Sequence, residues 1–156
     1  FVTMWQAGSI WGSNWFFVGA LLPWLVIGFF FAMKRHRLLD IFQLGDETAI
    51  SVGIAVKKER IVSLLLAVML AASAISVTGG INFLGLLAPH IARKCGFTQQ
   101  KQVLPLAALF GSLLLLVSDT IGRLLPGNGE MPAGIIVAII GAPYFLYLLI
   151  KTSDSL

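Results

Sequence analysis

Long apolar runs separated by short polar stretches organise this chain. Uncharged runs cover residues 15–33, 61–92, 103–118 and 131–150, and the charged residues gather between them. A run of about 18 or more apolar residues can cross a bilayer as an α-helix. The run 61–92 is too long for one ordinary span and contains Gly79-Gly80, so we expect it to divide there into a hairpin. The pattern predicts about five membrane segments, with approximate bounds 15–33, 61–78, 81–92, 103–118 and 131–150, the third being short or irregular.

The basic residues orient these segments. Ten of the eleven Lys and Arg residues fall beside the ends of apolar runs that would share one side of a membrane. Cytoplasmic loops carry such an excess of Lys and Arg. We therefore expect an outer loop at 1–14, a cytoplasmic loop at 34–60 and a cytoplasmic C-terminus, with Arg123 alone on the outer side. The ten residues are Lys34, Arg35, Arg37, Lys57, Lys58, Arg60, Arg93, Lys94, Lys101 and Lys151.

Composition supports an all-α, polytopic transmembrane helix bundle. Apolar residues make up 58% of the chain and charged residues 12%, and the mean hydropathy is +0.92, all outside the range of soluble domains. The net charge of +4 is spread over short clusters, which suits lipid headgroups and does not form the stripe expected for nucleic acid. Cys95 is the single cysteine, and His90 stands alone in its apolar run, so we expect no metal site and a structural role for His90.

The polar stretch 34–60 carries helix signals. Asp40 precedes Gln43 by three residues, the spacing of a capping box, and Gly45-Asp46-Glu47 resembles a helix start with Gly53 as its stop. The two acidic residues would lie at the positive end of the second helix. Two short helices along the inner face satisfy these signals, either as a purely structural feature or as a docking surface for a cytoplasmic partner.

Two features near the other end of the chain remain open to more than one interpretation. Arg123 follows Asp119 by four residues, which allows an ion pair on one helix face. In the last run, Pro132 can open a short helix that Gly141-Ala142-Pro143 should break. A broken helix at membrane depth is tolerated beside protein or a water-filled cavity, so this segment either borders a path or relieves packing.

Four blocks resemble a known family in order and spacing: LGDETAISVGI, GGINFLGLLAPHIARKCG, LPLAALFGSLLLLVSDTIGRLL and EMPAGIIVAIIGAPYFLYLLIK. They look like the signature blocks of the permeases of type II ABC importers for ferric siderophores, haem and cobalamin, over essentially the whole chain. The resemblance implies a permease of ten membrane helices that works as a homodimer or heterodimer in the bacterial inner membrane. This chain would be the C-terminal half.

The resemblance also implies partners and sites. In the family, short coupling helices in the inner loop sit in clefts of two cytoplasmic ATPase subunits, which hold ATP and Mg; this chain would bind no cofactor and catalyse nothing. Arg123 matches an outward arginine that meets a glutamate of the substrate-binding protein. The coupling residues implied are Leu44, Gly45, Asp46, Glu47, Ala49 and Gly53. The residues expected to border the translocation path are Pro132, Gly134, Val137, Gly141 and Pro143.

The favoured function is therefore import of an iron-siderophore-type chelate, powered by a separate ATPase. An intramembrane enzyme using His90, Asp119 and Arg123 is the alternative from another class, and it requires these side chains to meet within hydrogen-bond reach. A structural membrane scaffold is the third possibility, although it leaves the capped inner loop without a purpose.

Overall fold

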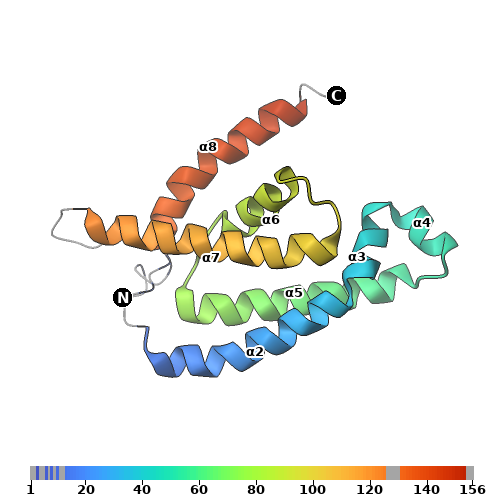
Figure 1. Ribbon diagram of the computed structural model, residues 1–156, viewed down its shortest axis with the longest axis horizontal. Coiled ribbons are helices and arrows are strands. Elements are labelled where there is room, and N and C mark those ends of the chain that lie inside the picture. Colours follow the sequence, from blue (N-terminus) through green and yellow to red (C-terminus); the bar gives the residue numbers. More distant parts are fainter. Residues whose placement is uncertain are drawn as a thin grey trace.

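The computed structural model describes residues 3, 6, 8, 10, 13–125 and 131–153, and long helices dominate that part of the chain (Figure 1). Most of the expected outer loop 1–14 lies outside the described residues, as does Glu130. The main helices, in chain order, are α2 (Trp15–Lys34), α3 (His36–Gln43), α4 (Asp46–Ser51), α5 (Val56–Thr78), α6 (Leu84–Lys94), α7 (Gln100–Leu124) and α8 (Ala133–Ser153).

Four of these helices, α2, α5, α7 and α8, are long and apolar enough to cross a membrane. At most 28% of the most apolar window of any of them is buried within the chain. Large apolar side chains such as Phe16, Leu65 and Leu116 are therefore exposed along the four helices. Such a surface is unfavourable in water and suits lipid or neighbouring membrane helices. The chain is a multi-pass membrane protein built from α-helices.

The apolar run 61–92 divides where the glycine pair predicts. Helix α5 ends at Thr78, and Gly79 follows it with a φ of 75° that L side chains rarely adopt. Helix α6 then has only 11 residues, about 16 Å at 1.5 Å per residue. That is roughly half of a 30 Å hydrocarbon core. The expected segment 81–92 is thus a short helix, and four full spans remain.

The helices pack in two groups. Helix α2 lies along α5, while α6 packs on α7 and α7 on α8. Figure 1 shows α3 and α4 together at one end of the molecule, where α2 ends and α5 and α7 begin. The C-terminal end of α7 and the start of α8 lie at the opposite end. This arrangement gathers the short helices and most of the basic residues at a single end.

Small residues set the closest helix approaches. A Cβ added at Gly28 of α2 would collide with the Leu70 side chain of α5, and one added at Gly141 of α8 would lie 2.7 Å from Phe83 Cβ. Gly111 of α7 is buried against Ala88 of α6. These positions let backbones come together as small residues do in membrane bundles. Ala67 and Ala71, two small residues four apart on α5, are instead exposed in this chain.

The expected break in the last helix is wrong. Helix α8 continues from Ala133 to Ser153 with Pro143 inside it. A proline removes one backbone N–H from the helix, whereas a full break would free several backbone groups where no water can satisfy them. Losing one hydrogen bond at Pro143 costs less than breaking the helix. Helices α2, α6 and α7 each contain an internal proline as well.

Candidate functional site

The strongest candidate site is the short-helix surface formed by residues 36–53, which we call the α3–α4 surface. It connects the end of α2 to the start of α5 (Figure 1). Helix α3 also contacts α7, and α4 contacts α5. The surface is therefore joined to three of the four long helices.

Two glycines define the bounds of α4. Gly45 has φ 102° and ψ 159°, a conformation that is essentially restricted to glycine, and it lies between the end of α3 and the first residue of α4. Gly53 has a φ of 83°, and its N–H donates to Ile50 O at 2.9 Å as α4 ends. The Ile54 N–H donates to Ala49 O at 3.0 Å. The helix start and stop expected at these glycines are confirmed.

The side chains in and beside α4 divide into an anchor and an exposed apolar group. Ala49 is fully buried and holds the helix against the rest of the chain. Leu44, Ile50 and Val52 are 69%, 64% and 63% exposed, although each is apolar. Exposed apolar groups among polar neighbours mark surfaces that contact another protein or lipid. Leu44 is among the coupling residues that the resemblance implies, but Ile50 and Val52 are not. Their apolar side chains inside an otherwise polar loop are the sequence signal for them.

One ion pair joins the α3–α4 surface to α5, and a second, beside it, joins the end of α2 to α5. Arg60 of α5 pairs with Asp46 at 2.5 Å, and Arg35 at the end of α2 pairs with Glu59 of α5. The Arg60–Asp46 pair is exposed, and such pairs contribute about 0–1 kcal/mol, so it orients the surface more than it stabilises the fold. Glu47 takes part in none of the ion pairs found among the described residues, and it is exposed. Its charge is available to a partner.

Asp40 has a different role from the one that its spacing suggested. Helix α3 begins at His36, so Asp40 lies inside it and the expected capping box with Gln43 is wrong. Its Oδ1 instead accepts a hydrogen bond of 2.7 Å from the backbone N–H of Gln100, the first residue of α7. The first N–H groups of a helix have no partner within it. Asp40 therefore caps α7 from another helix and connects the α3–α4 surface to a membrane span.

Arg123 lies in the last turn of α7, at the other end of the molecule from α3 and α4. Its Nε donates to Asp119 Oδ2 at 2.8 Å, so the ion pair allowed by their spacing forms. The Arg123 side chain is 52% exposed. About half of the Arg123 side chain therefore remains on the surface of the chain. Its docking role stays a prediction.

The alternative intramembrane enzyme requires His90 to meet Asp119 and Arg123, and of these three described residues only the last two form a hydrogen bond with each other. The buried Nε2 of His90 has no hydrogen-bond partner within the described part of the chain, and its ring packs edge-on against Tyr144 at 5.7 Å. No hydrogen bond or ion pair found among the described residues joins His90 to the Asp119–Arg123 pair. Lys94 lies over the rings of Tyr144 and Tyr147, which completes a contact between α6 and α8. The described residues also contain no group of three or more His, Cys, Asp or Glu side chains placed to hold a metal ion.

The residues expected to border a path lie at the start and middle of α8. Gly134, Val137 and Gly141 are buried on one face of the helix, and Gly141 approaches Phe83 and Leu87 of the α6 region. Pro132 is half-buried and Pro143 is exposed. The three buried residues thus pack within this chain, and a role beside the path stays a prediction.

Four apolar spans, with short helices gathered at one end, define the class as a multi-pass α-helical membrane protein. The chain belongs to the FecCD transport family, whose family model matches residues 1–151. This places the chain in a family of transport proteins.

Relatives in that family are named as importer permeases. The chain is 47% identical over 150 residues to the iron(3+)-hydroxamate import system permease protein FhuG of Bacillus subtilis, covering 96% of this chain and 45% of that protein. It is 37% identical to the Fe(3+) dicitrate transport system permease protein FecD of Escherichia coli, covering 95% and 46%. It is 36% identical to the hemin transport system permease protein HmuU of Yersinia pestis, covering 98% and 46%.

A solved structure gives the same fold. A metal-chelate type ABC transporter in an inward-facing conformation matches with a TM-score of 0.86 and 27% sequence identity, covering 96% of this chain and 48% of that one. The chain therefore spans about half the length of the relatives that it matches.

Proposed function

We propose that this chain forms part of the transmembrane subunit of an ATP-driven importer for an iron chelate of the siderophore type. The relatives named above carry iron(3+)-hydroxamate, iron(3+) dicitrate and hemin in their names, and the structural relative is of the metal-chelate type. These names favour an iron-hydroxamate or similar ferric chelate as the cargo of the importer. The chelate keeps its iron, so the permease needs to pass the complex and not to ligate the metal.

The α3–α4 surface is the single observation that carries this proposal. It combines the buried anchor Ala49 with the exposed carboxylate of Glu47. It also exposes the apolar side chains of Leu44, Ile50 and Val52. Asp40 fixes it to α7, and the Asp46–Arg60 ion pair fixes it to α5. A partner that moves this surface would therefore move membrane spans directly. Two cytoplasmic ATPase subunits suit that requirement, and ATP and Mg²⁺ would be held by them.

The distribution of charge supports an orientation for the subunit in a bacterial cytoplasmic membrane. The end that carries α3, α4 and most of the Lys and Arg residues would face the cytoplasm. Arg123 would then face outward, where it suits an acidic group on a substrate-binding protein. A second permease subunit, identical or related, would complete the path that Pro132, Gly134, Val137, Gly141 and Pro143 are proposed to border.

Co-purification tests the proposal. The full-length permease that contains this chain is expressed with its ATPase subunits, as wild type and as Glu47→Arg. We expect the ATPase to co-purify with wild type and to be lost on charge reversal, because Glu47 is exposed and takes no part in the ion pairs described above. Lys151→Glu is the matched control, since it reverses an exposed charge at the end of α8. Absence of the ATPase from wild type, or its retention by Glu47→Arg, would refute the proposal.

A further inference from the structure

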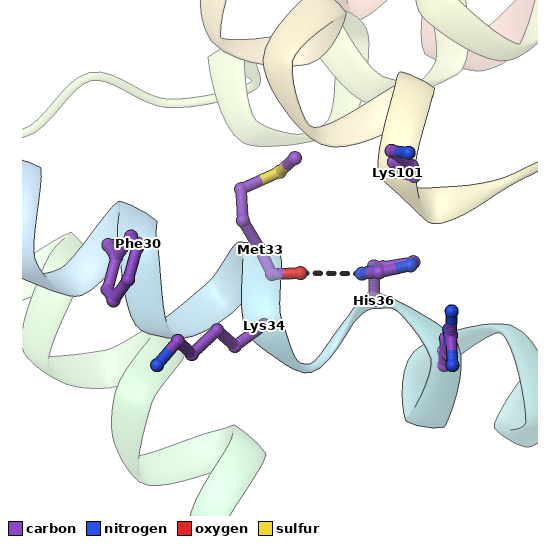
Figure 2. A pocket seen from close by; sticks show the side chains of 6 residues that line it. Phe30, Met33, Lys34, His36 and Lys101 are labelled. Atoms are coloured by element: carbon purple, nitrogen blue, oxygen red, sulfur yellow. Dashed lines mark hydrogen bonds between the residues drawn. The ribbon is translucent and has the colours of Figure 1, made fainter.

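A groove lies beside the α3–α4 surface, where three helices meet (Figure 2). It is lined by the last turn of α2, the first turn of α3 and the first turn of α7, and it has a volume of about 430 Å³. Small-molecule sites commonly have about 300–1,000 Å³. Its lining residues are Phe30, Met33, Lys34, His36, Arg37 and Lys101.

The charge of this groove is unbalanced. Lys34, Arg37 and Lys101 take part in none of the ion pairs among the described residues, which use Arg35, Arg60 and Arg123 instead. The Asp40 carboxylate accepts a hydrogen bond from the backbone N–H of Gln100, the residue before Lys101, and it offsets at most one of the three positive charges. Three cationic side chains from three helices thus line one groove, and this favours an anionic ligand.

The polar and apolar parts of the groove are ordered along α2. Phe30 is exposed and lies one turn before Lys34, whose Nζ is 4.6 Å from the centre of the Phe30 ring. The His36 Nδ1–H donates to Met33 O at 2.6 Å, which turns the other edge of the ring away from the α2 backbone (Figure 2). Apolar surface therefore adjoins the uncharged span 15–33, and the cations follow immediately beyond it.

We propose that this groove binds the phosphate of an anionic phospholipid of the leaflet on the α3–α4 side. The headgroup phosphate would lie among Lys34, Arg37 and Lys101, while an acyl chain would follow Phe30 and the exposed side chains of α2. A phosphate suits Lys and Arg because each N–H donor makes a charge-assisted bond to an oxygen. The position of the groove at the end of a membrane span favours a lipid over a free anion. The proposal requires no particular cargo and no ATPase.

Native mass spectrometry of the full-length permease, released from micelles that contain phosphatidylglycerol or phosphatidylcholine, tests this site. Both lipids carry the phosphate, but only phosphatidylglycerol has a net negative charge. We expect wild type to retain phosphatidylglycerol preferentially. The variant Lys34→Gln/Arg37→Gln/Lys101→Gln should lose about fivefold in that retention for each charge removed.

The control variant Lys57→Gln/Lys58→Gln/Lys151→Gln removes the same number of charges from exposed positions outside the groove. It should retain phosphatidylglycerol as wild type does. Equal losses in the two triple variants, or equal retention of the two lipids by wild type, would overturn the proposal. Displacement of the lipid by inorganic phosphate would also overturn it, because the groove would then be a free-anion site.

A single variant keeps the test valid if the triple variant does not fold. Lys101→Gln changes one exposed side chain in the first turn of α7. In wild type, phosphatidylglycerol should raise the thermal unfolding temperature above the value in phosphatidylcholine, and Lys101→Gln should reduce this difference. An unchanged difference in Lys101→Gln would contradict a site that includes this residue.

Discussion

Gly45 and Asp40 show how single residues determine the form of the α3–α4 surface. The backbone at Gly45 turns through φ 102° and ψ 159°, although no atom would obstruct a Cβ there. The requirement for glycine is therefore conformational and not steric. Asp40 supplies an acceptor to an N–H group 60 residues further along the chain. Gly45 shapes the α3–α4 surface locally, and Asp40 connects that surface to α7.

Gly45→Ala should destabilise the permease by about 1–3 kcal/mol, because alanine is strained at this backbone conformation. Gly19→Ala is the control, since Gly19 lies in α2 with open space around it and alanine favours helix. Thermal unfolding in micelles, followed by circular dichroism, measures both variants. Equal unfolding temperatures for the two variants would show that alanine is not strained at position 45.

Asp40→Ala should expose the N-terminal amides of α7 and cost about 0.5–2 kcal/mol, as removal of a helix cap does. Asp40→Asn keeps an oxygen acceptor, so the first amides of α7 should remain largely protected from hydrogen exchange. Hydrogen exchange of the backbone amides at residues 100–102 reports on the cap directly. Slow exchange in Asp40→Ala, equal to that of wild type, would mean that Asp40 does not hold this helix end.

At the scale of elements, the contact between α6 and α8 depends on Gly141. Its absent side chain lets α8 approach Phe83 just before α6, and Gly122 of α7 makes a similarly close approach to Met131 before α8. His90 and Lys94 of α6 extend the contact by packing on Tyr144. The short α6 helix is therefore held between α7 and α8 by small residues and aromatic rings.

Gly141→Ala should destabilise this contact by about 1–3 kcal/mol, because the added Cβ would lie 2.7 Å from Phe83 Cβ. Gly85→Ala is the matched control on α6, where nothing lies within 4 Å of the added carbon. Unfolding by sodium dodecyl sulfate in mixed micelles compares the two variants. If Gly85→Ala were the more damaging change, the close approach at Gly141 would not be what limits packing.

The elements that the sequence predicted well are those determined by local pattern. The four spans follow from apolar length, and the bounds of α4 follow from Gly45 and Gly53. The cap by Asp40 could not be predicted, because its partner is distant along the chain and local spacing suggested Gln43 instead. The expected break at Gly141-Ala142-Pro143 is wrong because a continuous helix loses only one hydrogen bond at Pro143, whereas a break would free several backbone groups where no water can satisfy them.

At the scale of the whole molecule, the two ends differ in chemistry. One end carries α3, α4 and the cationic groove, and the other carries the Arg123–Asp119 pair. The site roles of both ends were implied by family resemblance, since an exposed carboxylate or arginine does not itself identify a partner. The geometry adds the exposed Ile50 and Val52 and the connection from α3 to α7.

Arg123→Glu should slow association with the substrate-binding protein by about tenfold at low ionic strength, because exposed charges act mainly on the rate of encounter. The effect should shrink as salt screens the charges. Arg93→Glu, an exposed reversal in the last turn of α6, is the control and should leave the rate unchanged. Surface plasmon resonance at two salt concentrations measures the rates. A loss that is independent of salt would contradict a docking role for Arg123.

We propose that the α3–α4 surface couples a partner ATPase to import. The most direct measurement of this coupling is uptake of an iron(III)-hydroxamate chelate into proteoliposomes that contain the full-length permease, its ATPase and its binding protein. We predict uptake that requires ATP and that is abolished by Leu44→Asp/Ile50→Asp but retained by Lys151→Glu. Uptake that proceeds without ATP, or at the wild-type rate in Leu44→Asp/Ile50→Asp, would contradict the account.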